Sequence, residues 1–136
     1  MTVGPLPDHL HADTVARWEA CGLMQPWNDA AEDLRRAVRG PASAVLAHVS
    51  AGQLVGRAMF GHDGHRGWLY SLAVREDSRG QGVGQALVAA CEAWTSARGV
   101  PELQLMVRAG NAPVVAFYEG LGYETSAVVV LGRRLD

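Results

Sequence analysis

The sequence predicts an α/β (α+β) fold in which helices flank a mixed, mainly antiparallel sheet. Three observations support this prediction. Strand-like and helix-like segments alternate along the chain, three consecutive β-rich runs are separated only by turns, and an apolar period of helical spacing follows them. The chain has 136 residues, of which 49% are apolar and 19% charged, so a single domain over residues 1–136 is expected.

The first half of the chain is expected to hold a short edge strand, two helices and three antiparallel strands. Asp8 can cap the first helix, and residues 29–32 have the capping spacing of the second helix. Gly40 and Pro41 end that helix, and residues 51–52 form the turn of a hairpin. The predicted segments are a strand at 3–6, a helix from 8 to about 22, a helix from 29, and strands at 44–50, 53–61 and 68–74.

The second half is expected to alternate helix, strand, helix and strand. Val83, Leu87 and Cys91 recur at helical spacing, and Gly99 ends this helix. The predicted element order is therefore β-α-α-β-β-β-α-β-α-β. The remaining predicted segments are a strand at 103–107, a helix that Asn111 caps and Gly122 ends, and a strand at 127–131.

Composition excludes several classes of function. The formal net charge is -2, so the chain lacks the basic surface that binds nucleic acid phosphates. It contains no lysine, which excludes a Walker phosphate loop and Schiff-base chemistry. No apolar stretch is long enough to span a bilayer, and the N-terminus lacks the pattern of a signal peptide.

The two cysteines, Cys21 and Cys91, lack the spacing of a metal or redox site. Each lies among apolar neighbours in a predicted helix, so both are expected to be reduced core residues of a cytoplasmic protein. The sequence thus predicts neither a metal nor a nucleic acid or membrane partner.

The most informative segment is a glycine-rich turn between a predicted strand and a predicted helix. The first N–H groups of a helix have no partner within it, and the helix dipole favours an anion there. Gly80, Gly82 and Gly84 remove the side chains that would keep a diphosphate away from those groups. Arg79 adds a fixed positive charge. A tight turn without a ligand explains the same glycines, whereas Gln85, in place of a last glycine, disfavours a Rossmann dinucleotide site.

Two motifs give the sequence a specific resemblance to a family. The run Arg79-Gly80-Gln81-Gly82-Val83-Gly84, after Leu72-Ala73-Val74, resembles the acetyl-CoA motif of the GCN5-related N-acetyltransferases (GNAT). The second half of the pattern is present as Asn111 and residues 117–123. The resemblance covers essentially the whole chain, and residues 26–29, 63–67 and 131–135 are similar to those of the small bacterial YpeA-like subgroup.

The chain departs from the family in two places. Glu76 stands where members often have proline, which adds a negative charge near the turn. The tail after Tyr123 is short for the usual pair of final strands, so a truncated sheet edge and an edge completed by a partner, as in a homodimer, both stay open.

The resemblance implies the GNAT fold and acetyl-CoA as co-substrate. Backbone groups of the third antiparallel strand would pair with the pantetheine arm, and the turn would hold the diphosphate. Asn111 would contact the arm, although a role as helix cap is equally open. The implied cofactor-binding residues are Leu72, Ala73, Val74, Arg79, Gly80, Gln81, Gly82, Val83, Gly84, Gln85 and Asn111.

The resemblance also implies that Tyr118 is the catalytic acid. Acyl transfer to an amine needs a neutral nucleophile, a stabilised oxyanion and a proton for the departing thiolate. A phenol titrates near ~10 and a thiol near ~8.5, so this proton transfer is uphill by only about 2 kcal/mol. Without the motif, Tyr118 would be interpreted as part of the apolar helix face with Phe117 and Leu121.

The general base is left open. His62, Asp63 and His65 cluster in the turn before the third antiparallel strand, but a solvated turn explains them better. Tyr70 lies in that strand and is expected to be a packed aromatic residue. The pair Asn28-Asp29 could line an acceptor pocket, although helix capping explains it sufficiently.

Two hypotheses of function follow. The first is an N-acetyltransferase that acts on a primary amine of a small molecule, a protein N-terminus or a lysine. The second is a non-catalytic acyl-CoA-binding sensor or regulatory module. Tyr118 favours catalysis, and the sequence does not identify the acceptor.

Overall fold

The computed structural model describes residues 2–10 and 30–136. The chain divides into two compact units, Met1–Met106 and Val107–Asp136. The first unit carries a five-stranded sheet with two α-helices among its described residues, and the second carries one helix and an extended segment.

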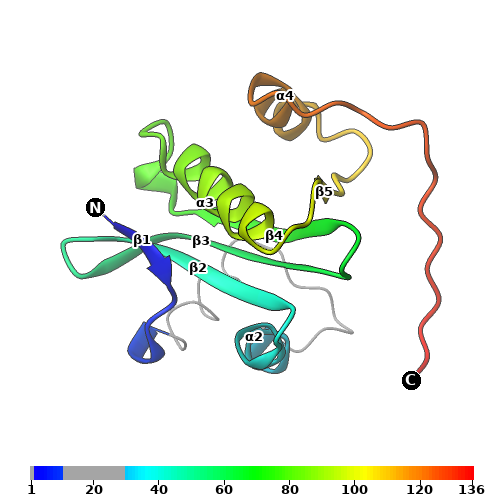
Figure 1. Ribbon diagram of the computed structural model, residues 1–136. Helices are drawn as coiled ribbons and strands as arrows, with labels where there is room; N and C mark the ends of the chain where they lie inside the picture. Colours follow the sequence, from blue (N-terminus) through cyan, green and yellow to red (C-terminus); the bar gives the residue numbers. More distant parts are fainter. Residues whose placement is uncertain (1, 11–29) are drawn as a thin grey trace. The chain divides into compact units, whose positions relative to one another are not determined.

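The sheet of the first unit has the strand order β1-β2-β3-β4-β5 (Figure 1). Neighbouring strands from β1 to β4 pair antiparallel, whereas β4 and β5 pair parallel. This is the mixed, mainly antiparallel sheet that the sequence predicts. The strands are β1 (Thr2–Pro5), β2 (Ser43–Ser50), β3 (Gln53–His62), β4 (Gly67–Val74) and β5 (Leu103–Leu105).

Two helices cover opposite faces of the sheet (Figure 1). α2 (Ala30–Arg39) packs on β2 and β3, and α3 (Val83–Ala97) packs mainly on β3 and β4. Successive residues of a strand point to opposite faces, so β3 contributes to both cores. Met59 packs on the α2 side, whereas the ring of Phe60 meets that of Trp94 in α3 at 4.9 Å between centroids.

The start of α3 lies directly over β3. Val83, Leu87 and Cys91 are all buried, which confirms the helical period expected for this segment. A Cβ added at Gly56 of β3 would lie 2.7 Å from Val83 Cγ1 and 3.0 Å from Leu87 Cδ1. The glycine therefore allows the close approach that fixes where α3 begins.

The second unit is organised around Tyr118. Its helix, α4 (Ala112–Gly120), has Pro113 in its first turn and is followed by Gly122 with φ at 95°, as the sequence predicts. The ring of Tyr118 packs edge-on against Phe117 at 5.0 Å and Tyr123 at 5.6 Å between centroids.

Three predicted elements differ in the structure. The described part of the first predicted helix is a 3-10 turn, η1 (Asp8–Leu10), and residues 11–29 lie outside the described residues. β5 ends at Leu105 because its pairing with β4 ends there. The predicted strand at 127–131 is wrong, since this segment is extended but pairs with no strand among the described residues. A strand without neighbours is not stable in water.

Candidate functional site

The predicted anion-binding turn connects β4 to α3. The chain passes through a short 3-10 helix, η2 (Glu76–Ser78), before the glycines. Gly80 and Gly82 have φ values of 76° and 81°, a region that residues with side chains rarely adopt. No heavy atom lies within 4 Å of the place where a Cβ would stand on either glycine. The glycines therefore allow the backbone conformation of this turn. They also leave the N-terminal end of α3, here called its mouth, open.

The first turn of α3 has N–H groups without helical partners. Gly82 is the N-cap and contributes no side-chain cap. The amide of Ala86 donates to the carbonyl oxygen of Gly82 at 3.0 Å, so the N–H groups of residues 83–85 precede the helical ladder. Together with the positive end of the helix dipole, they can bind an anion.

Arg79 is exposed at this mouth. Its Nε donates to the carbonyl oxygen of Val74 at 3.3 Å, which holds the guanidinium near the end of β4. Within the described part of the chain, its terminal nitrogens make no hydrogen bond or ion pair. They are therefore available for two phosphate oxygens.

A second arginine, Arg75, pairs with one of the two carboxylates of η2. Nε of Arg75 pairs with the carboxylate of Asp77, and Nη1 of Arg75 donates to Oε1 of Gln53 at 2.9 Å. This link joins the turn to the start of β3. Glu76, the departure noted in the sequence, is exposed. Of the two carboxylates of η2, one is thus already paired with a cation.

β4 and β5 separate next to the turn. Their pairing ends at Leu69 and Leu105, whereas β4 continues to Val74. The segment Leu72 to Val74 is half-buried and pairs with β3 on one side. Backbone groups on its other side are not paired with β5, so they can bind an extended chain that carries amides.

The remaining predicted site residues lie in the second unit. Asn111 occupies the predicted N-cap position of α4, but the expected side-chain cap is absent and the side chain is exposed. Tyr118 is only 8% exposed. The structure thus groups residues 72–85 in one unit, and Asn111 with Tyr118 in the other.

The candidate bases before β4 form a structural turn. Oδ1 of Asp63 accepts hydrogen bonds from the backbone N–H groups of His65 at 2.8 Å and Arg66 at 2.7 Å. The bonds from Arg66 and then His65 hold the pKa of Asp63 below its ordinary value. Nδ1 of His62 accepts from the N–H of Gly64 at 3.0 Å. These contacts support the interpretation as a solvated turn for Asp63 and His65. For His62 it is wrong, because His62 is the half-buried last residue of β3 and its ring packs on that of Trp94 at 5.7 Å between centroids.

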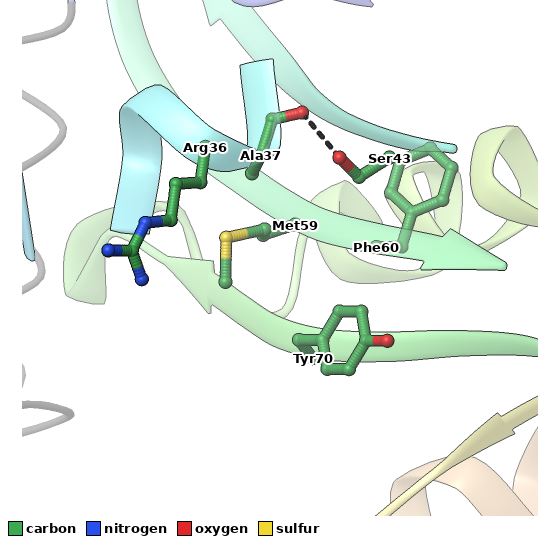
Figure 2. A pocket seen from close by; sticks show the side chains of 6 residues that line it. All are labelled: Arg36, Ala37, Ser43, Met59, Phe60 and Tyr70. Carbon is green, nitrogen blue, oxygen red and sulfur yellow. Dashed lines mark hydrogen bonds between the residues drawn. The ribbon is translucent and has the colours of Figure 1, made fainter. Parts of the chain in front are cut away.

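A cavity of about 210 Å³ lies in the first unit among α2, β2, β3 and β4 (Figure 2). Tyr70 lines it and is 57% exposed, so the prediction of a packed strand aromatic is wrong. The register of β3 and β4 shifts here, and Tyr70 is the residue of β4 without a partner on β3. Asn28 and Asp29, predicted near an acceptor pocket, lie outside the described residues. The lining residues are Arg36, Ala37, Ser43, Met59, Phe60 and Tyr70.

Comparison with known proteins decides the family. The Acetyltransferase (GNAT) family model matches residues 12–123. An acetyltransferase of Yersinia enterocolitica is 42% identical over 123 residues, which is 90% of this chain and 87% of that protein. The chain belongs to the GNAT acetyltransferase family. An acetyltransferase of Pectobacterium atrosepticum is also 42% identical to the present chain, over 89% of this chain and 86% of the Pectobacterium protein.

Solved structures share the fold of this acetyltransferase. The aminoglycoside N-acetyltransferase AAC(6')-Iy, in complex with CoA, has a TM-score of 0.85 at 17% identity and covers 99% of this chain and 95% of its own. A ribosomal-protein-alanine N-acetyltransferase from Brucella melitensis has a TM-score of 0.77 at 19% identity, with 98% of both chains covered. The predicted GNAT fold is confirmed.

Three further observations on this acetyltransferase concern metal binding, membrane spanning and thiol chemistry. Within residues 2–10 and 30–136, no group of three His, Cys, Asp or Glu side chains is placed to hold a metal. No helix in the same ranges is long and apolar enough to cross a bilayer. Burial raises the pKa of the Cys91 thiol to about 12, so Cys91 is an unreactive core group, as predicted. Cys21 lies outside the described residues.

Sequence reasoning missed the link from Arg75 to Gln53 and the cavity beside Tyr70. Both depend on contacts between residues far apart in the chain. The extra residue in β4 leaves no trace in the hydrophobic alternation, because a bulge is defined by the partner strand. No local signal in the sequence points to these features.

Proposed function

We propose that this protein is an acetyl-CoA-dependent N-acetyltransferase, which transfers the acetyl group directly to a primary amine of a small molecule, protein or peptide. The observation that carries the proposal is the open mouth of α3. Gly80 and Gly82 leave room beside N–H groups that have no helical partner, and Arg79 adds a cation. Membership of the acetyltransferase family supports the same reaction.

Acetyl-CoA fits these groups as co-substrate. Its diphosphate matches the donors at the α3 mouth, and its pantetheine amides match the free backbone edge beyond the last β4–β5 pair. When bound, it supplies an activated acyl group with a thiolate as leaving group. The same fold binds CoA in AAC(6')-Iy. The proposed cofactor-binding residues are Leu72, Ala73, Val74, Arg79, Gly80, Gln81, Gly82, Val83, Gly84, Gln85 and Asn111.

We assign the acid role to Tyr118. In the proposed reaction the amine nitrogen forms a bond to the acetyl carbon, the carbon–sulfur bond breaks, and the electron pair goes to sulfur. Tyr118 gives its phenolic proton to that sulfur. The amine loses its own proton to water or to a base. Asp63 is a poor base, because its Oδ1 already accepts two backbone hydrogen bonds.

The two units are proposed to act as one N-acetyltransferase domain over residues 1–136, because the family model spans parts of both. We place the protein in the cytoplasm, in keeping with the buried thiol of Cys91. Its partners are an amine acceptor and, we propose, a second copy of the chain. The net charge of -2 argues against nucleic acid as a partner.

The cofactor site is tested by thermal unfolding with and without CoA. A ligand at about 100 times its Kd stabilises the folded state by about 2.7 kcal/mol. The double variant Arg79→Ala/Gly82→Val should lose this stabilisation, because the valine side chain would occupy the place of a phosphate oxygen. The matched control is Gly64→Val/Arg66→Ala, which alters an exposed glycine of positive φ and a nearby arginine in another turn. Full stabilisation of the folded double variant would refute the site.

The acid is tested by thiol release from acetyl-CoA with a panel of amines. Tyr118→Phe should lower turnover by about 10²-fold or more, with the affinity for CoA nearly intact. Tyr123→Phe, the neighbouring phenol, should keep its turnover. Equal turnover of Tyr118→Phe would mean that water or another group protonates the thiolate. Binding of CoA with no turnover of any amine or peptide would favour the sensor hypothesis.

A further inference from the structure

The cavity beside Tyr70 adjoins the proposed thioester position. Tyr70 is the first residue of β4 after Leu69, where the pairing of β4 with β5 ends. The backbone edge proposed for the pantetheine arm, Leu72 to Val74, begins two residues later. An acceptor in the cavity would therefore lie next to the acyl group, and the inference below rests on the proposed function.

The walls of the cavity are mostly apolar. Phe60 and Ala37 are buried, and Met59 is a polarizable side chain that adapts to flat or branched groups. Figure 2 shows Met59 reaching from β3 toward the strand that carries Tyr70. The hydroxyl of Ser43 already donates to the carbonyl oxygen of Ala37 at 2.8 Å. Apart from the rim residue Arg36, the cavity thus offers a ligand an apolar surface and the phenol of Tyr70.

Two arginines lie near the cavity. Arg36 lines its rim, pairs with Glu32 at 3.2 Å, and has its guanidinium turned away from Met59 and Tyr70 (Figure 2). Arg57 lies on the same face of β3 as Met59, is buried, and donates to Ser71 Oγ at 2.9 Å. Among the described residues, those that line the cavity include no carboxylate.

The size of the cavity limits its occupant. Its volume is about 210 Å³. Pockets that enclose a whole drug-sized ligand have about 300–1,000 Å³. The cavity therefore holds one side chain or ring, while the rest of a larger acceptor stays outside.

We propose that the acceptor is a primary amine with one aromatic or branched aliphatic group, and that Met59 and Tyr70 hold this group. Aromatic packing on Tyr70 and Met59 gives the selectivity. The phenol of Tyr70 stays at the cavity mouth, where it can accept a hydrogen bond from the amine.

The test compares 2-phenylethylamine and isoamylamine with ethanolamine, spermidine and kanamycin as acceptors. The wild-type protein should have the highest kcat/KM for the two apolar amines. Tyr70→Ala should lower kcat/KM for 2-phenylethylamine by about tenfold or more and leave that for ethanolamine nearly unchanged. Tyr70→Phe should keep the preference, and so should Val38→Ala, a control on the exposed part of α2 that does not line the cavity.

Two results would overturn the inference. One is a preference for spermidine or kanamycin, and the other is an equal loss for all amines in Tyr70→Ala. Calorimetric titration of 2-phenylethylamine into the CoA complex tests the cavity apart from the chemistry. Binding of 2-phenylethylamine that Tyr70→Ala abolishes would support the cavity assignment, even if no amine is acetylated. Absence of turnover with every amine would contradict the proposed enzyme activity and not the cavity assignment. Absence of both binding and turnover of apolar amines would refute the cavity assignment.

Discussion

His48 lies in β2 opposite Gly56 and is buried. It is 5% exposed, and its Nδ1 is buried without a hydrogen bond to any described residue. Burial lowers the pKa of the imidazole from its ordinary value, because the charged form loses its water. The folded protein therefore resists taking a proton that the unfolded chain takes readily.

We predict that this histidine makes stability depend on pH. Above about pH 6.5, His48 is neutral in both the folded and the unfolded state, so it does not make the free energy of unfolding depend on pH. As the pH falls below that value, the unfolded chain binds a proton first, so stability falls until the lower pKa of the folded state is reached. The Tm of the wild type should thus fall more between about pH 7.5 and 5.5 than that of His48→Leu. His65→Gln, in an exposed turn, should keep the wild-type slope. Equal slopes for wild type and His48→Leu would contradict the assignment.

At the scale of elements, regular segments with a local pattern were predictable. The period of Val83, Leu87 and Cys91 marks α3 because one face of a helix must be apolar. Ala51 and Gly52, with φ values of 51° and 75°, mark the hairpin. The backbone path of the glycine-rich turn was also predictable, since Arg79 and the three glycines lie within six consecutive residues.

Elements whose extent depends on a partner were not predictable. Leu103–Leu105 is a strand only as far as β4 pairs with it, and the run at 127–131 has strand composition but no neighbour among the described residues. The cavity needs side chains from α2, β3 and β4, so no local pattern encodes it. Asn111 was placed correctly at the start of α4, yet its side chain makes no cap.

The contact between α3 and β3 gives a prediction for Gly56. A methyl group there would meet Val83 at 2.7 Å and Leu87 at 3.0 Å, and both are buried at the start of the helix. Gly56→Ala should therefore destabilise the fold by about 1–3 kcal/mol. Gly4→Ala in β1 is the matched control, since nothing lies within 4 Å of its added Cβ. Urea unfolding measures both, and equal midpoints would mean that α3 does not rest on Gly56.

An open strand edge and an exposed apolar tail are complementary features of the whole molecule. β5 is the last strand of the sheet, and its outer edge is unpaired among the described residues. The tail carries four consecutive large apolar residues, Val128 to Leu131, of which Val129 is 86% and Leu131 is 91% exposed. Apolar β-branched segments of this kind pair readily with open strand edges. In a symmetric dimer, each tail can cover the edge of the other copy.

We therefore predict a homodimer that depends on the tail. Sedimentation equilibrium should give twice the chain mass of 14.5 kDa for the wild type. Val129→Pro should give a monomer, because proline removes a backbone donor and cannot join a ladder as a central residue. Ser126→Pro, just before the apolar run, should leave the dimer intact. A dimer that survives Val129→Pro would place the interface elsewhere, and a wild-type monomer would mean that the apolar run stays uncovered or folds back onto its own chain.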